Sequence, residues 1–226
     1  MIVPRPLTVT IPAGSFLMGA SPGDKFANAT EEPRRAVEIT KPFALGVSPV
    51  TVSEWAAFEA DHDSGPAGKL PVVNVSLNDV ERYLAWLNSL WTGRLWRLPT
   101  EEEWEYACRA GTETIFHTGD QLGNEEANFL FNEAIERSGP GGRTPVGTYP
   151  TNPWGLHDMH GNVVEWTSSP WKRDLHPGSA AILERYTVRG GSWDLLPRLL
   201  RSSWRDGVHR SARRDNLGFR VARDLD

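Results

Sequence analysis

The side chains best suited to chemistry are few and widely spaced. Cys108 is the only cysteine among 226 residues, so the chain forms neither an internal disulfide nor a zinc site from several thiolates. Of six histidines only His157 and His160 lie close together, and they flank a loop motif instead of forming a helical pair. Cys108 falls at an inward-facing position of an expected helix, where a small buried hydrophobic residue is the commoner occupant. These residues favour structural roles, with an iron site or a cysteine nucleophile as the minor alternatives.

The stretch 194–214 mixes large apolar residues with charged ones. Leu195, Leu196, Leu199 and Trp204 lie among Arg, Asp and His with no periodicity that a strand or helix could bury. An apolar cluster rimmed by charge is typical of a binding surface, and Trp and Arg are frequent hot-spot residues. The alternative is that the leucines fill the core.

The C-terminal segment is basic on an acidic chain. Residues 189–223 contain nine arginines and three aspartates, a net charge of +6 in a chain whose total is −5. Such an excess suits an anionic ligand or nucleic acid, but arginines in loop-rich regions also hold loops through backbone carbonyls. No basic helix or base-stacking sheet motif accompanies them, so we favour the structural interpretation and do not expect nucleic-acid binding.

Short strands and three helices are expected to position these residues. The alternation in 7–19 around Pro12 and Gly14 predicts a hairpin, and 36–39 and 43–47 are typical of strands.

Each expected helix begins with a start signal. Thr51 with Glu54 and Thr100 with Glu103 form capping boxes, and Ser76 precedes an apolar stripe at helical spacing. The region 118–171 is rich in Gly, Pro and Asn, which predicts long packed loops and very short strands. The expected class is α+β.

The chain shows no feature that directs it to a membrane. It contains no apolar run approaching the ~18 residues that span a bilayer. The first residues lack the apolar stretch and the cleavage site of a secretion signal. We therefore expect a cytoplasmic protein without membrane insertion, which a partner could still carry to a surface.

Four motifs together resemble a known family, the formylglycine-generating-enzyme (sulfatase-modifying factor) domain. They occur at residues 11–19, 97–111, 152–166 and 189–193, the last closed by Leu-Gly-Phe-Arg at 217–220. The resemblance runs from about residue 8 to 223. It implies a loop-rich C-type-lectin-like α+β fold with about three helices, occupying 1–226 as a single domain.

The resemblance also bears on catalysis. In the sulfatase-activating members, two cysteines that follow the Gly-Gly-Ser-aromatic motif bind copper, and these positions are Leu195 and Leu200 here. Leucine neither ligates a metal nor forms a thiolate, so we expect no redox cofactor and no enzyme activity. Related sulfoxide synthases take their iron ligands from a separate domain that this sequence lacks. The rival reading is an iron- or copper-dependent oxidoreductase of this family, with ligands from a partner chain.

A calcium loop is implied by the same family. Its members bind Ca²⁺ through a loop that matches 158–165. By resemblance the ligands are Asp158 and Glu165 through their side chains and Gly161 and Val163 through their carbonyls, a set of hard oxygen atoms that calcium prefers. The alternative is that the two carboxylates only cap loop N–H groups. The family's second calcium site lacks its aspartate here.

Residues 190–220 resemble the variable region of proteins diversified by diversity-generating retroelements. The framework positions would be 190–193, 197–198, 200–202, 205 and 217–220. The interleaved positions would form the displayed binding site: Asp194, Leu195, Leu196, Leu199, Trp204, Asp206, Val208, His209, Ser211, Arg213 and Arg214. The sequence therefore predicts a non-catalytic scaffold that binds an unknown protein or other macromolecular ligand through outward-facing side chains.

Overall fold

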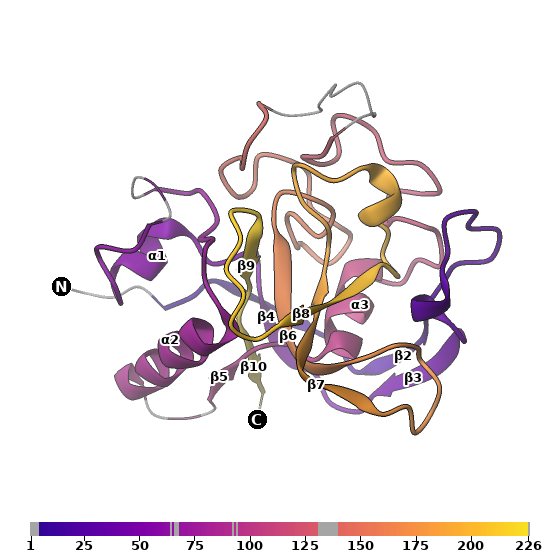
Figure 1. The fold of residues 1–226 in the computed structure, drawn as a ribbon, viewed down its shortest axis with the longest axis horizontal. Coiled ribbons are helices and arrows are strands. Elements are labelled where there is room, and N and C mark those ends of the chain that lie inside the picture. The colour runs from indigo at the N-terminus through magenta and orange to yellow at the C-terminus, as the bar shows by residue number, and fades with distance from the viewer. Residues whose placement is uncertain are drawn as a thin grey trace.

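The computed structural model describes residues 5–63, 65, 68–91, 93, 95–130 and 140–225. The helices in this part of the chain are α1 (Val52–Ala56), α2 (Leu77–Leu90), α3 (Glu101–Arg109) and the short 3-10 turns η1 (Ala29–Glu31) and η2 (Pro197–Leu199). The strands are β1 (Thr8–Ile11), β2 (Gly14–Met18), β3 (Arg35–Ile39), β4 (Phe43–Gly46), β5 (Trp96–Arg97), β6 (Val164–Lys172), β7 (Ala181–Arg189), β8 (Arg205–His209), β9 (Leu217–Phe219) and β10 (Ala222–Asp224). Long irregular connections separate them (Figure 1). The mixed composition confirms the predicted α+β class.

One sheet joins the two ends of the chain. Its order is β1-β4-β10-β5, with β10 antiparallel between β4 and β5, so that Ala222 lies opposite both Leu45 and Arg97. The strands expected at 36–39 and 43–47 are confirmed as β3 and β4.

The predicted hairpin at the start of the chain is wrong. β1 and β2 both form, but β1 pairs with β4 while β2 pairs with β3 in a separate two-stranded sheet. Turn residues such as Pro12 bend the chain at a predictable place, but the partner of each strand depends on contacts made far along the sequence.

All three predicted helices form, each after a capping box. Thr51, Ser76 and Thr100 accept hydrogen bonds from the backbone N–H three residues later, and the carboxylate at that later position accepts a bond from the backbone N–H of the cap residue. The predicted apolar stripe of α2 faces the core through Val80, Leu84 and other residues. None of the helices in the described ranges combines the length and apolarity needed to cross a membrane.

Aromatic side chains build the main core beside α2. The rings of Trp55 and Tyr83 stack with centroids 5.2 Å apart, and Phe219 meets both rings edge-on. Trp166 is fully buried, and its indole N–H donates to the carbonyl of Val75 at 3.0 Å. The core thus ties α1 and α2 to the sheet that contains β6 and β9.

The second four-stranded sheet carries the C-terminal segment. Its order is β8-β7-β6-β9, with β9 parallel to β6 and the other pairs antiparallel. β6 has nine residues, which corrects the expectation of only very short strands before residue 171. In Figure 1 this sheet crosses the middle of the view with η2 above β8, while α1 and α2 lie at the left. The sheet therefore presents the segment 190–220 on the face toward the viewer.

Candidate functional site

Buried arginines hold the C-terminal segment in place. Arg189, on β7, is completely buried and forms an ion pair with Glu105 of α3. Its guanidinium also donates to the carbonyls of Ser202, Ser203 and Trp204 at 3.0, 2.8 and 2.6 Å. One side chain thus fixes three consecutive carbonyls of an irregular loop, as expected for arginines in a structural role.

Arg201 connects the same segment to the N-terminal half of the chain. It donates to Glu31 at 2.6 and 2.7 Å and to Asp24 at 2.6 Å, and the side chains of all three residues are buried. The hydroxyl of Ser203 donates to Glu31 as well, at 2.6 Å. Burial alone disfavours the charge, but the bonds and charges of Glu31 and Asp24 raise the pKa of Arg201 above its ordinary value.

Arg205 completes this set at the start of β8. It makes a bidentate ion pair with Glu101 at the N-terminus of α3 and donates to the carbonyls of Thr30 and Lys172 at 2.8 and 2.9 Å. Its guanidinium also lies 4.5 Å from the ring centroid of Trp171, a cation–π contact. Much of the segment's basic charge therefore lies inside the protein, on Arg189, Arg201, Arg205 and the equally buried Arg220. This burial supports the structural interpretation of these arginines.

The interleaved positions divide into three groups by exposure. Five are exposed: Asp206, His209, Ser211, Arg213 and Arg214. Four are partly buried: Asp194, Leu195, Leu196 and Leu199. Two are buried: Trp204 at 7% exposed and Val208 at 1%.

The prediction that Trp204 and Val208 face outward is therefore wrong. Both side chains belong to the main apolar core, where Val208 lies on β8 opposite Tyr186 of β7. Withdrawing large apolar side chains from water favours this arrangement wherever a core surface lies within reach. The other nine of the eleven positions are exposed or partly exposed.

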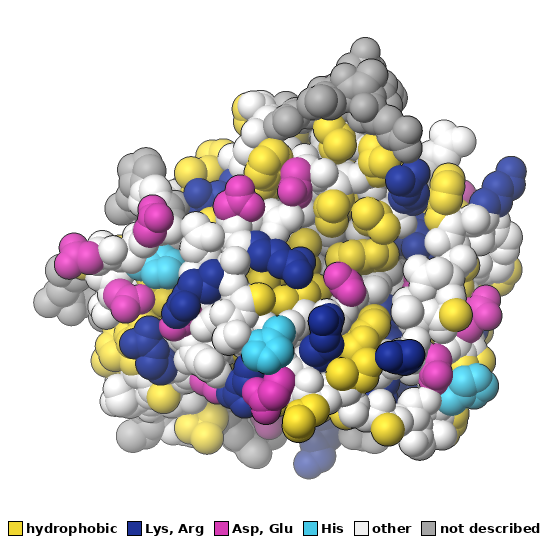
Figure 2. Space-filling model, in the orientation of Figure 1, with side chains coloured by type: hydrophobic (Ala, Val, Ile, Leu, Met, Phe, Trp, Pro, Cys, Tyr) yellow, Lys and Arg dark blue, Asp and Glu magenta, His cyan; other side chains and the backbone are white. Residues whose placement is uncertain are grey.

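Partly buried leucines line a pocket in this surface. The pocket has a volume of about 390 Å³, and its walls include Leu195, Leu199 and Trp204, with Arg214 at its edge. Figure 2 shows hydrophobic side chains gathered near the centre of this face, with basic and acidic side chains around them. The arrangement combines an apolar floor with a charged rim, as binding sites commonly do.

Sequence reasoning missed Trp171, which forms another wall of the pocket. It lies on β6, outside the segment 190–220. Its ring packs on Gly207, where an added Cβ would come within 2.3 Å of the indole Cγ. A glycine inside a strand often marks such a close approach, so Gly207 was the available signal, although it does not reveal which ring approaches.

The predicted calcium loop is strongly bent, but one of its carboxylates already serves protein donors. Glu165 is completely buried and accepts bonds from Trp104 Nε1 at 2.8 Å and from two nitrogens of Arg220 at 2.7 Å each. A bidentate arginine satisfies a carboxylate well, and a dication beside it would meet the positive guanidinium. Glu165 therefore fits poorly as a calcium ligand.

Asp158 fits the calcium prediction better. It is 7% exposed and accepts from the backbone N–H of Gly147 at 3.1 Å and from Asn162 Nδ2 at 3.3 Å. Burial raises the pKa of Asp158 despite these bonds, so a cation nearby would stabilise its ionised form. Asp158, Gly161 and Asn162 all adopt positive φ angles, which bends the loop through Val163. The calcium site remains a prediction for which Asp158 is the suitable carboxylate.

Cys108 and His160 lie together in the interior. The thiol is completely buried, and its pKa is raised by burial to about 12, so it stays protonated near neutral pH. His160 shares a 2.7 Å hydrogen bond between Nδ1 and the carbonyl of Leu200, and its Nε2 accepts from the backbone N–H of His117 at 3.1 Å. Burial holds the pKa of His160 well below its ordinary value. The neutral ring thus joins two loops, as a structural histidine does.

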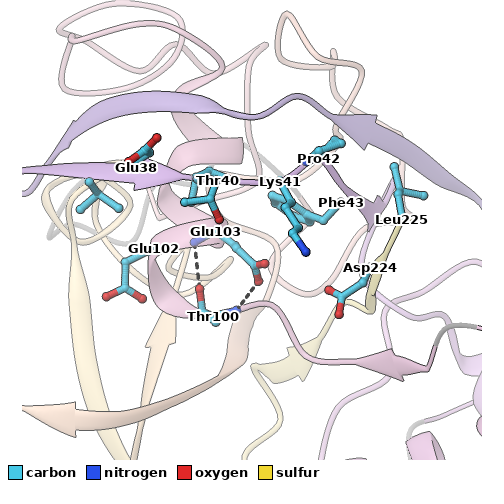
Figure 3. Close-up of a pocket in the computed structure, with 12 residues that line it drawn as sticks. Glu38, Thr40, Lys41, Pro42, Phe43, Thr100, Glu102, Glu103, Asp224 and Leu225 are labelled. Carbon is cyan, nitrogen blue, oxygen red and sulfur yellow. Dashed lines mark hydrogen bonds between the residues drawn. The ribbon is translucent and has the colours of Figure 1, made fainter.

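A larger pocket lies near the C-terminus, away from the segment 190–220. It has a volume of about 570 Å³, and Figure 3 shows its acidic side chains spread around the opening, with Glu103 bonded to Thr100. Glu103 and Asp224 are also paired with Arg97. Glu103 thus serves a helix cap, and Glu103 and Asp224 serve ion pairs. Within the described ranges, no three His, Cys, Asp or Glu side chains are grouped so as to hold a metal ion.

The sheets, the three capped helices and the arginine-held C-terminal segment define a domain of the formylglycine-generating type. The family model described as "Sulfatase-modifying factor enzyme 1-like domain" matches residues 3–225, and the chain belongs to this family. This confirms the resemblance and the predicted C-type-lectin-like fold.

Several known proteins share the domain. The chain is 30% identical to the mouse protein "Inactive C-alpha-formylglycine-generating enzyme 2", over 96% of this chain and 85% of that protein. It is 29% identical to the hercynine oxygenase of Mycolicibacterium smegmatis, over 96% of this chain but only 61% of that enzyme. The solved structure of PvdO from Pseudomonas aeruginosa matches with a TM-score of 0.83 and 32% identity, covering 97% of this chain and 95% of that one.

A second solved structure shows a likeness of fold alone. Treponema denticola variable protein 1 matches with a TM-score of 0.81 and 22% identity, covering 96% of this chain and 95% of that one. The names of the sequence relatives thus denote an inactive protein and an oxygenase, while the variable protein shares the fold.

Proposed function

We propose that this chain is a non-catalytic binding scaffold, of the kind that diversity-generating retroelements vary, which contacts a protein or other macromolecular ligand through the surface formed by 194–214. The observation that carries the proposal is the alternation within this segment. Arg201, Ser202 and Arg205 are buried, while Asp194, Leu196 and Asp206 and other interleaved residues reach the surface.

The energetic contrast between the two sets supports a display function. Removing one partner of a buried ion pair typically costs about 3–5 kcal/mol because it leaves an uncompensated charge. Substituting an exposed residue without such contacts usually changes stability by about 0.5 kcal/mol or less. Side chains at the exposed positions can therefore change while the arginine framework keeps the backbone in place.

The absence of the family's copper-binding cysteines supports a non-catalytic function. Leu195 and Leu200 occupy the two corresponding positions, and Leu200 is completely buried. The thiol of Cys108 is also buried and protonated. The name of the mouse relative shows that this family contains members without the enzyme's activity.

An oxidoreductase that uses iron or copper is the second candidate, favoured by the likeness to a hercynine oxygenase. Isothermal titration with Cu(I) and with Fe(II) separates the two candidates. The scaffold should bind neither metal specifically, whereas the oxidoreductase should bind one of them stoichiometrically in the presence of its partner.

A pair of surface-display libraries tests the proposed function. The first randomises Leu196, Asp206, His209, Ser211 and Arg214, and the second randomises five buried framework residues: Ser192, Arg201, Ser202, Arg205 and Phe219. Folding is followed by protease resistance, and binders are selected against one fixed protein such as hen lysozyme. The proposal predicts that most members of the first library fold and yield binders, while most of the second do not fold. Equal losses of folding in both libraries would contradict it.

A further inference from the structure

We propose that the pocket beside Leu195 and Leu199 receives one large apolar side chain of a protein partner, and that Arg214 binds an acidic residue next to that side chain. The proposal rests on the proposed function, because it specifies the partner chemistry that the present surface recognises. It follows from the shape and lining of the pocket, the free charges at its rim, and the polar groups that are already engaged.

Large apolar side chains form part of the pocket wall and pack against the core behind it. Trp171 and Trp204 contribute ring surfaces, and both are buried except for about 7% of their area. Leu195 and Leu199 pack against two separate core clusters, one containing Trp204 and the other Phe116. A volume of about 390 Å³ lies at the lower end of the range for ligand pockets. This volume is sufficient for a single side chain such as phenylalanine or leucine.

Arg214 is the arginine of this rim that is available to an anion. Its side chain is exposed and has no hydrogen-bonded or ionic partner among the described residues, whereas Arg205, which also lines the pocket, is buried and paired with Glu101. The backbone of Arg214 is nevertheless fixed, because its carbonyl accepts from two backbone N–H groups at 2.9 and 3.3 Å. A positioned and unpaired guanidinium is a ready partner for a carboxylate.

The other charges at the rim define where the acidic residue lies. Asp206 is exposed and accepts only from the adjacent N–H of Gly207 among the described residues, so this edge of the pocket repels a carboxylate. The carboxylate of Asp194 accepts from Asn216 Nδ2 at 3.0 and 3.1 Å, so it is less available to a cation than the carboxylate of Asp206. The partner's acidic residue therefore lies on the side of Arg214.

The polar groups around the pocket favour a protein over a sugar. The amide of Asn216 is bonded to Asp194, and the side chain of Asn28 is bonded to Glu31 and Thr30. A carbohydrate ligand needs several free donors and acceptors, which these engaged amides do not supply. An apolar side chain next to an acidic residue needs only the apolar surface and a cation such as Arg214, which has no partner among the described residues.

Four blocked peptides test the proposal by titration, followed by the indole N–H signals of the protein in NMR spectra. The probes are Ac-Gly-Phe-Glu-Gly-amide and the versions that replace Glu by Gln, Glu by Lys, or Phe by Ala. The Phe-Glu peptide should bind about fivefold more tightly than the Phe-Gln peptide, the upper range for one exposed ion pair. The Phe-Lys peptide should bind more weakly than the Phe-Gln peptide, and the Ala-Glu peptide should not bind measurably.

Two variants assign the binding to the pocket and to its arginine. Arg214→Gln should abolish the difference between the Glu and Gln peptides while it preserves binding of phenylalanine, and Leu199→Ser should weaken all peptides that contain phenylalanine. Arg198→Gln is the matched control, since Arg198 is an exposed arginine of the same segment outside this pocket, and it should leave the ranking unchanged.

Absence of binding by all four peptides, or a ranking insensitive to Arg214→Gln, would overturn the proposal. The proposed function would be unaffected by that result. It is judged by the display libraries, whose outcome does not depend on the side chains that line the pocket at present.

Discussion

Replacing Arg201 with methionine removes the cation that faces two buried carboxylates. Arg201 is 1% exposed, and the Glu31 and Asp24 side chains that it binds are completely buried. Methionine preserves much of the aliphatic volume but provides no donor, so both carboxylates lose their ionic partner. Loss of one member of a buried ion pair typically costs about 3–5 kcal/mol, and two stranded carboxylates place this variant at the upper end.

Urea denaturation, followed by tryptophan fluorescence and by far-ultraviolet circular dichroism, measures the change in the free energy of unfolding. Because a domain typically has about 5–15 kcal/mol of stability, the variant should unfold at a much lower urea concentration or be unfolded without urea. Arg214→Met is the matched control, because Arg214 is exposed and has no ionic partner in the described structure, and it should change stability by about 0.5 kcal/mol or less. A second variant, Arg201→Met with Glu31→Gln, should recover part of the loss. A loss below about 1 kcal/mol for Arg201→Met, or equal losses for both single variants, would refute the framework argument.

Three further predictions concern the same separation of buried and displayed residues. Trp204→Ser should lower the free energy of unfolding by about 3–5 kcal/mol because the indole is in the core, whereas Leu196→Ser should lower it by about 1 kcal/mol or less. Comparable losses of the two variants in thermal denaturation would show that Leu196 also supports the fold. Cys108 should resist iodoacetamide at pH 8 in the native protein and react once urea unfolds the chain, since burial raises its pKa to about 12; rapid labelling of the native protein, detected by mass spectrometry, would contradict its interior placement. If Ca²⁺ binds through Asp158, a hundredfold excess over the Kd should raise the free energy of unfolding by about 2.7 kcal/mol, and EDTA or Asp158→Asn should remove this gain; a thermal transition that is indifferent to both Ca²⁺ and EDTA would exclude the site.

Local signals allowed the helices to be predicted from sequence. A capping box such as Thr51 with Glu54 places donor and acceptor within one turn, so the residues that define the helix start are neighbours in the sequence. The same holds for Thr100 with Glu103. The family motifs then supplied the overall fold, which no periodicity in the loop-rich region after residue 111 could have indicated.

The sequence did not indicate which residues, far apart along the chain, pair with each other. The pairing of Arg201 with Glu31 joins residues 170 positions apart, and that of Arg205 with Glu101 joins residues 104 apart. Composition indicates that arginines will be structural, but not which carboxylates they meet. Local alternation likewise predicted β1 and β2 as strands. Their pairing was predicted wrongly because each strand pairs with a partner, β4 or β3, that lies farther along the sequence.

The sequence indicated which segment contributes to the candidate site, but not all of the residues that line its pocket. Alternation of framework and interleaved positions correctly indicated exposure for Asp206 and Arg214, because charged side chains rarely enter a core unpaired. The same alternation wrongly indicated exposure for Trp204 and Val208, because apolar side chains tend to be buried and both lie in the core. Trp171 comes from another strand, so only the folded chain brings it to the pocket.

A stability profile of every single substitution from 190 to 220, measured by resistance to protease, tests the central claim most directly. The arginine framework and the displayed residues should give two separate distributions, with large losses at positions such as Arg201 and Arg205 and small losses at positions such as Leu196 and Asp206. Substitutions of Trp204 and Val208 should give large losses of stability, like those of the framework residues. A single distribution, in which exposed and buried positions lose stability alike, would contradict the account.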